Sequence, residues 1–144
     1  MVDRSHKGRV FPSFSMTVER GKLREFLLAT GDDNPVYQAD DPPLPPTFPA
    51  VFLFWGSGGL EDALRQIGVE IWNVLHAEQE YEYLAPIHVG DTVIGTTRVE
   101  DIYARGSGEG ALEFVEFVTD YVNQAGETVV RDRALIIVRE HGTP

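Results

Sequence analysis

The chain has 144 residues, no cysteine and a formal net charge of −11 at pH 7. This length predicts one domain, over residues 1–144, with room for a substantial core. The lack of cysteine excludes disulfides and thiolate metal sites. The acidic balance argues against nucleic-acid binding, which needs a basic face. No stretch is apolar for long enough to span a bilayer, and the polar N-terminus lacks the apolar run of a signal peptide, so we expect a cytoplasmic protein.

The first predicted helix covers residues 18–30. Its apolar positions recur at helical spacing and are Leu23, Phe26, Leu27 and Thr30. Thr17 is a candidate for the N-cap, and Gly31 can end the helix in a left-handed conformation. Residues 10–16 alternate partly, which predicts a short strand or an extended segment before the helix.

The stretch after this helix, residues 31–37, reads Gly-Asp-Asp-Asn-Pro-Val-Tyr. It places two carboxylates, an amide and a phenol on a backbone that Pro35 stiffens. Asp and Asn are also ordinary turn formers. Taken alone, Asp32 and Asn34 are therefore best interpreted as parts of a helix-capping turn.

Prolines crowd residues 38–50, and we expect a loop there because a helix cannot pass through them. Residues 47–55 turn apolar and are expected to enter the core. A second helix is predicted over residues 57–67, and Gly68 ends it. Its apolar face consists of Leu60, Ala63, Leu64 and Ile67.

Residues 76–83 alternate between the two faces of a predicted strand. One face carries the acidic side chains of Glu78, Glu80 and Glu82, and the other carries Gln79, Tyr81 and Tyr83. The same alternation places His76 on the face of the glutamates.

Longer strands are predicted over residues 92–103, 111–122 and 128–139, with turns between them. Helices followed by antiparallel strands indicate an α+β fold, in which something must cover one face of the sheet. Strands of roughly 10–14 residues exceed the usual length, so we expect a strongly curved sheet wrapped around the helix at 57–67. Such a sheet leaves an edge that a partner chain can pair with or cover.

Four motifs resemble those of hotdog-fold proteins of the MaoC-like dehydratase group. Residues 31–37 resemble the group's Gly-Asp-x-Asn-Pro-x-His hydratase motif, and residues 46–48 (Pro-Thr-Phe) match an element of its N-terminal-type domain. Residues 75–81 resemble the Leu-His-Gly-Glu-Gln stretch of that domain, and residues 86–92 resemble a proline-to-Gly-Asp turn common in hotdog strands. The resemblance covers about residues 10–140 and implies a curved antiparallel sheet wrapped around a central helix.

The resemblance implies an (R)-specific enoyl-thioester hydratase or, in reverse, a 3-hydroxyacyl-thioester dehydratase of fatty acid metabolism. The substrate would be an acyl thioester of coenzyme A or acyl carrier protein, with no metal and no other cofactor. In active members the motif's Asp and His bind a water that adds to C3, and a proton is delivered at C2. Here Asp32 stands at the Asp position, but Tyr37 stands where the His belongs. A tyrosine with a reference pKa near ~10 is a poor base at neutral pH.

This departure resembles the noncatalytic subunit of heterodimeric dehydratases, in which one hotdog carries the dyad and the other shapes the acyl tunnel. Three functions stay open. The chain is the substrate-binding subunit that pairs with a catalytic MaoC-like subunit, or a self-sufficient homo-oligomeric hydratase that uses Asp32 with His76 or Tyr37. The third is a noncatalytic module that binds acyl thioesters.

The candidate catalytic residues are Asp32, Tyr37 and His76, and the candidate substrate-binding residues are Asn34, Phe48, Glu78 and Gln79. Phe48 is the best candidate for lining an acyl tunnel, and most of its aromatic neighbours are expected in the core: Phe52, Phe54 and Trp55. The arginines of the later strands are expected to be solvated rather than to meet coenzyme A phosphates: Arg105, Arg131, Arg133 and Arg139.

Overall fold

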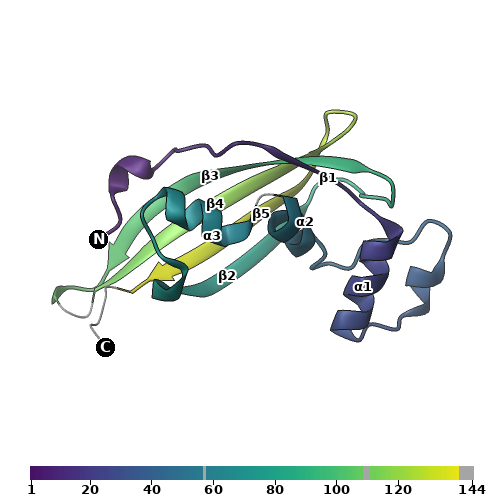
Figure 1. The fold of residues 1–144 in the computed structure, drawn as a ribbon, viewed down its shortest axis with the longest axis horizontal. Coiled ribbons are helices and arrows are strands. Elements are labelled where there is room, and N and C mark those ends of the chain that lie inside the picture. The colour runs from purple at the N-terminus through teal and green to yellow at the C-terminus, as the bar shows by residue number, and fades with distance from the viewer. Residues whose placement is uncertain (57, 109–110, 140–144) are drawn as a thin grey trace.

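The computed structural model describes residues 1–56, 58–108 and 111–139. Its three helices are α1 (Arg20–Thr30), α2 (Pro49–Gly56) and α3 (Gly59–Gln66), with short 3-10 turns η1 (Arg4–His6), η2 (Pro35–Gln38) and η3 (Ile71–Asn73). Its strands are β1 (Phe14–Thr17), β2 (Val74–Tyr83), β3 (Thr92–Arg105), β4 (Leu112–Asn123) and β5 (Thr128–Val138). They form one antiparallel sheet in the order β1-β3-β4-β5-β2 (Figure 1).

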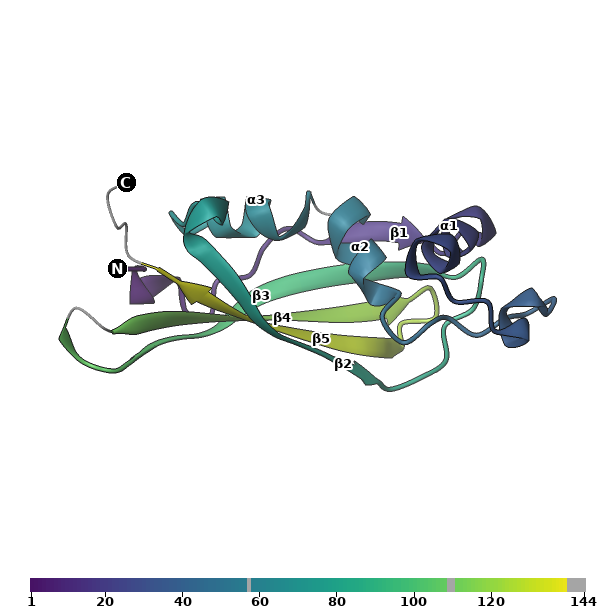
Figure 2. The same cartoon turned by 90° about the horizontal axis from the view of Figure 1, so that it is seen from below.

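All three helices lie on the same face of the sheet, and none of the described residues forms a helix on the opposite face (Figure 2). The predicted α+β class, with long antiparallel strands under a helical cover, is confirmed. Buried positions recur at every second residue of β4 and β5 on the face toward the helices. In the described part of the chain, no helix is long and apolar enough to cross a membrane.

The helical cover differs from the prediction, because it consists of two short helices instead of one. Residues 47–55 were expected only to enter the core, yet α2 begins at Pro49. Proline is tolerated at the first position of a helix, where its missing N–H costs no hydrogen bond. The exclusion of helix from residues 38–50 was therefore wrong at its last two positions. Gly58, with φ 80°, is the N-cap of α3. Ser57, which the prediction placed first in the second helix, lies outside the described residues.

The ends of α1 show one wrong and one correct prediction. Thr17 does not cap the helix, because it is the last residue of β1 and its hydroxyl lies 3.1 Å from that of Thr92. Glu19 takes the N-cap position without a side-chain hydrogen bond. Gly31 ends the helix at φ 69°, and its N–H donates to the carbonyls of the last turn, as expected.

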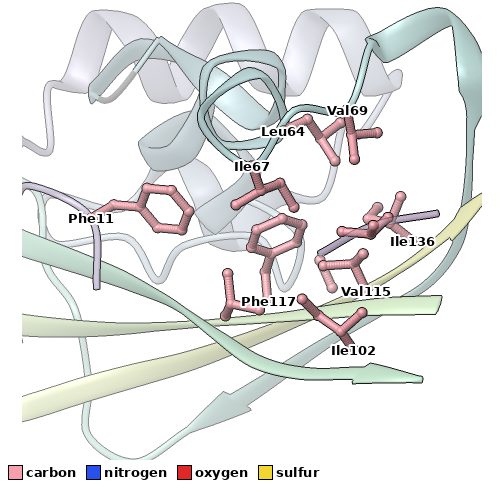
Figure 3. Close-up of a cluster of buried hydrophobic side chains, with 11 residues drawn as sticks. Phe11, Leu64, Ile67, Val69, Ile102, Val115, Phe117 and Ile136 are labelled. Atoms are coloured by element: carbon pink, nitrogen blue, oxygen red, sulfur yellow. The ribbon is translucent and has the colours of Figure 1, made fainter. Parts of the chain in front are cut away.

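The core consists of two apolar clusters between the helices and the sheet. The first lies under α3 and includes Phe11, Leu64, Ile67, Val115, Phe117 and Ile136 (Figure 3). The second lies under α1 and α2 and includes Val18, Leu23, Phe48, Phe52, Tyr121 and Val130. The second cluster thus anchors the part of the chain that carries residues 31–37.

The ring of Phe14 fixes α2 against the sheet because it lies between two glycines. A Cβ on Gly95 of β3 would lie 2.4 Å from Cζ of this ring, and one on Gly56 of α2 would lie 2.3 Å from Cδ2. The ring therefore cannot move away from one glycine without meeting the other. We expect Gly95→Ala to lower the free energy of unfolding by about 1–3 kcal/mol, as overpacking does, in chemical denaturation.

Gly21 provides the matched control, since a Cβ there meets nothing within 4 Å and the residue lies in α1. Gly21→Ala should leave stability unchanged or raise it slightly, because alanine is the better helix former. The double variant Phe14→Leu/Gly95→Ala should lose less than the two single variants together. Equal losses of unfolding free energy for Gly95→Ala and Gly21→Ala would contradict the packing of the Phe14 ring between Gly56 and Gly95.

Candidate functional site

Residues 31–37 form a rigid turn at the end of α1. The Asp32 N–H donates to the Leu27 carbonyl at 3.0 Å, and the Asp32 carboxylate accepts from the Asn34 N–H at 3.1 Å. Asn34 in turn accepts from the Val36 N–H at 3.0 Å and so caps η2, which Pro35 begins. Each side chain thus ties down the backbone two residues further on. This geometry fits the structural interpretation of Asp32 and Asn34.

Tyr37 is the residue of this turn that meets Asp32. Its ring is half-buried against the second core cluster. Burial raises the pKa of Tyr37 above its ordinary value, and the neighbouring Asp32 carboxylate adds to this shift through its charge and through hydrogen bonding to the phenol. The phenol is therefore protonated at neutral pH. It cannot accept a proton from a water held beside the carboxylate.

A cavity of about 670 Å³ opens between α1 and residues 31–38. Helix α1 lines it with leucines and two arginines, and the turn lines it with Asp32, Asp33 and Tyr37. The guanidinium of Arg20, one of these arginines, is occupied by the backbone carbonyls of Ala39 and Asp40. Arg24, in contrast, makes no hydrogen bond or ion pair within residues 1–56, 58–108 and 111–139. The cavity has the size and mixed lining of a small-ligand site.

Tyr83 joins the C-terminal end of β2 to this region. Its hydroxyl donates to the Pro46 carbonyl at 2.9 Å, which holds the proline-rich loop against the sheet. Burial and the neighbouring Tyr37 raise the pKa of Tyr83 to about 12. The sequence does not single out this residue, because alternation alone does not show which tyrosine of the strand meets the loop.

His76 lies near the other end of the same strand. Seven positions separate it from Tyr83, which at about 3.3 Å per residue amounts to more than ~20 Å. The structure therefore brings Asp32, Asn34 and Tyr37 together, but it does not bring His76 to them within one chain.

A bulge at the start of β2 changes the face on which His76 lies. His76 pairs with Ile136, whereas Glu78 pairs with Leu135, so the register shifts between them. Neighbouring residues of β5 point to opposite faces, and paired residues share a face. His76 consequently lies on the helix side of the sheet with Gln79, and Glu78 lies on the bare side. The prediction that His76 and Glu78 share a face was wrong.

Gln79 contacts a buried acid that the sequence analysis missed. Its amide donates to the carboxylate of Asp132 on β5, which is 3 % exposed. Burial raises the pKa of Asp132 to about 6, although the hydrogen bond from Gln79 opposes the shift. The sequence does hold a signal for this acid. Arg131 and Arg133 flank Asp132, so strand alternation that exposes both arginines turns the acid inward.

Phe48 is fully buried, in edge-to-face contact with the rings of Phe26 at 5.4 Å and Phe52 at 5.7 Å. The core prediction is right for Phe52 and wrong for Phe54 and Trp55, which are 66 % and 71 % exposed. These two side chains help to line an open apolar cavity of about 530 Å³ together with Phe26, Ala50 and Val51. Phe48 itself is buried, and the exposed apolar wall of this cavity consists of its neighbours on α1 and α2.

The arginines of the strands have partners within the chain. Arg131 contacts Asp120 at 2.7 Å, and Arg133 contacts Glu116, both on the bare face of the sheet. Arg105 lies over the ring of Tyr103 at 5.2 Å. These contacts place the three arginines on the strand surfaces, where the sequence analysis expected them.

Comparison with known families gives these features a context. A model of the "FAS1-like, dehydratase domain region" matches residues 5–132. The chain belongs to this family. A solved MaoC-like dehydratase shares the fold, with a TM-score of 0.75 and 19% identity over 94% of this chain and 43% of the other. The dehydratase family match and this fold confirm the recognition made from the four motifs.

Relatives of this FAS1-like dehydratase domain include a UPF0336 protein of Streptomyces coelicolor, 32% identical over 149 residues that cover 96% of this chain and 95% of the relative. A UPF0336 protein of Cutibacterium acnes is 32% identical over 103 residues, which cover 69% of this chain and 70% of the relative.

Solved structures confirm the hotdog fold. The HadBC (3R-hydroxyacyl-ACP dehydratase) complex of Mycobacterium tuberculosis matches with a TM-score of 0.74 and 19% identity, over 92% of this chain and 96% of the other. The ChsH1–ChsH2 complex of the same organism matches with a TM-score of 0.70 and 17% identity, over 94% and 88% of the two chains. At these identities the likeness concerns the fold.

Proposed function

We propose that this chain is the substrate-binding, noncatalytic subunit of an (R)-specific enoyl-thioester hydratase, which in reverse is a 3-hydroxyacyl-thioester dehydratase. The substrate is an acyl group carried on coenzyme A or acyl carrier protein. A second hotdog chain with an intact Gly-Asp-x-Asn-Pro-x-His motif performs the chemistry. In the hydration direction, the oxygen of water bonds to C3, a proton bonds to C2, and the double bond between them becomes single.

The observation that carries this proposal is the state of Tyr37. The hydration step needs a group that takes a proton from the attacking water, with a pKa near the working pH. Tyr37 occupies the motif position of that group, but burial and the neighbouring Asp32 carboxylate raise its pKa. Among residues 1–56, 58–108 and 111–139, Asp32 is therefore left without a basic partner, and His76 lies too far along β2 to replace Tyr37.

Two further observations support a two-chain assembly. Strand β2 lies at the outside of the sheet and has ten residues, most of them exposed, so it offers a long edge for pairing. Solved structures of this fold include the HadBC and ChsH1–ChsH2 complexes, each made of two different chains.

The apolar cavity beside Phe54 and Trp55 is a suitable place for part of an acyl chain.

The test is the hydration of a short trans-2-enoyl-CoA, followed as loss of the enoyl absorbance. The purified chain alone should show no turnover above background, and neither Asp32→Ala nor His76→Ala should change this. Mixing it with a catalytic hotdog chain from the same genome, one that keeps the motif's His, should produce turnover. In that mixture Asp32→Ala should leave the rate within a few-fold, whereas loss of the partner's motif Asp should abolish it.

The opposite pattern would identify one of the alternatives. Robust turnover by the lone chain that falls by about 10²–10⁴ with Asp32→Ala would establish a self-sufficient hydratase and overturn the proposal. Binding of enoyl-CoA without turnover, with or without the partner, would indicate a thioester-binding module instead.

A further inference from the structure

The exposed edge of β2 carries a row of carboxylates on the bare face of the sheet. Glu78, Glu80 and Glu82 pair across the ladder with Leu135, Arg133 and Arg131 of β5. The two arginines have their main contacts with Glu116 and Asp120 of β4, so this row lies on the face opposite the helices (Figure 2). We call Glu78, Glu80 and Glu82 the glutamate row.

The glutamate row is only partly neutralised within the chain. The Arg133 guanidinium lies 3.7 Å from Glu78 and 3.8 Å from Glu80, but it is already bound to Glu116. Arg131, which pairs with Glu82, is likewise bound to Asp120. The two arginines opposite the row are therefore shared with carboxylates of β4. The side chains of Glu78 and Glu80 are 65 % and 67 % exposed, and they can turn toward a strand laid along the edge.

This arrangement disfavours a second copy of the chain at the same edge. Two copies that continue one antiparallel sheet are related by a two-fold axis normal to the sheet, which keeps the bare faces on one side. The two copies of β2 can pair in several registers, and in each one the two-fold axis passes through a different residue. Wherever this axis lies between residues 78 and 82, a glutamate of one copy lies opposite or next to a glutamate of the other. Like charges directly opposite each other on paired strands are destabilising.

We propose that the glutamate row selects the partner of this chain: the edge of β2 pairs with a strand that carries Lys or Arg at alternate positions on the bare face, and it rejects a second copy. The inference rests on the two-chain assembly proposed above and specifies its interface. Charge pairing of this kind contributes more to the choice of partner than to raw affinity. The bulge at the start of β2 also limits which registers a partner strand can take.

A variant of the chain in which the charges of the glutamate row are reversed serves as the probe for this proposal. The variant Glu78→Lys/Glu80→Lys/Glu82→Lys presents the basic edge that the proposal requires. A mixture of this variant with the wild-type chain should form a one-to-one dimer, measured as mass by light scattering after size exclusion. The wild-type chain alone and the variant alone should stay monomeric. The mixed dimer should weaken as NaCl rises from about 50 mM to about 500 mM, because salt screens exposed charges.

Two matched variants serve as controls. The first tests whether a change in net charge alone produces the mixed dimer, and the second tests whether repulsion between the glutamates is what keeps the wild-type chain from self-association. Glu19→Lys/Glu61→Lys/Glu70→Lys changes the charge by the same amount at exposed positions away from β2, and it should form no mixed dimer. Glu78→Gln/Glu80→Gln/Glu82→Gln removes the repulsion, and its self-association should be about ten-fold tighter than that of the wild type.

Two results would overturn the inference. One is a wild-type homodimer as tight as that of the glutamine variant. The other is a mixture of the wild type and the reversed variant that stays monomeric at low salt. Because these measurements report mass and not turnover, their failure would leave the hydratase assay with the catalytic chain as an independent test of the proposed function.

Discussion

Phe52→Ala is expected to lower the free energy of unfolding by about 3–5 kcal/mol, the usual loss for a buried phenylalanine. Phe52 is fully buried on α2, and its ring lies 5.7 Å from that of Phe48 and 5.3 Å from that of Tyr121 on β4. It thus joins the helix to the proline-rich loop and to the sheet. Removing the ring leaves a cavity that the strands cannot close, and urea denaturation measures the loss.

Phe54 on the same helix is the matched control. It has the same chemistry but is 66 % exposed, so Phe54→Ala should cost less than about 1 kcal/mol. Phe52→Leu, which keeps most of the volume, should lie between the two and remain folded if the alanine variant does not. Similar losses for Phe52→Ala and Phe54→Ala would show that α2 is not anchored as the structure indicates.

Asp132→Asn is expected to stabilise the protein at neutral and alkaline pH, which is unusual for a substitution at a buried position. Burial raises the pKa of Asp132 to about 6 in the folded chain, while 3.8 is its ordinary value. Between these values the folded state binds more protons than the unfolded state, so stability falls as pH rises. The loss of stability caused by the ionised Asp132 carboxylate is complete above its pKa in the folded chain and absent below its pKa in the unfolded chain. It amounts to about 2–3 kcal/mol, since one pKa unit corresponds to about 1.4 kcal/mol.

The isosteric amide keeps an oxygen that can accept the hydrogen bond from Gln79 and carries no charge. Asp132→Asn should therefore exceed the wild type in stability at about pH 8 and match it near about pH 4 in denaturant titrations. Parallel stability curves for the two proteins across this range would contradict the assignment.

Asp120 on the neighbouring strand gives the opposite sign and serves as the contrast. Burial acts to raise its pKa, but hydrogen bonds from Arg131 and Arg98 outweigh burial and lower it. Its contribution to stability is present above the unfolded pKa and is lost as pH falls through the folded pKa. Asp120→Asn should consequently destabilise the protein at pH 8. Two acids on paired strands thus differ in sign because arginines bind Asp120, whereas Asp132 is buried and takes its hydrogen bond from the neutral amide of Gln79.

The sequence by itself determined the features that depend on a residue and its near neighbours. Gly31 ends α1 because a left-handed residue is needed there and glycine adopts it without strain. The apolar stretches that became β3, β4 and β5, with turn residues between them, predicted the sheet, and the four motifs predicted the hotdog fold. The replacement of the motif's His by Tyr37 is also readable from the sequence, because the pKa of a phenol is a property of the side chain.

Only the tertiary structure decided the features that depend on segments far apart in the chain. The face of His76 was mispredicted because a bulge follows from the register with β5, which local alternation does not contain. Asp132 went unnoticed because its burial depends on Gln79, 53 residues away, and on the helices above the sheet. The exposure of Trp55 beside the buried Phe52 likewise depends on how α2 lies on the sheet. Hydrophobicity fixes which side chains gain from burial, but packing between distant elements fixes which of them are buried.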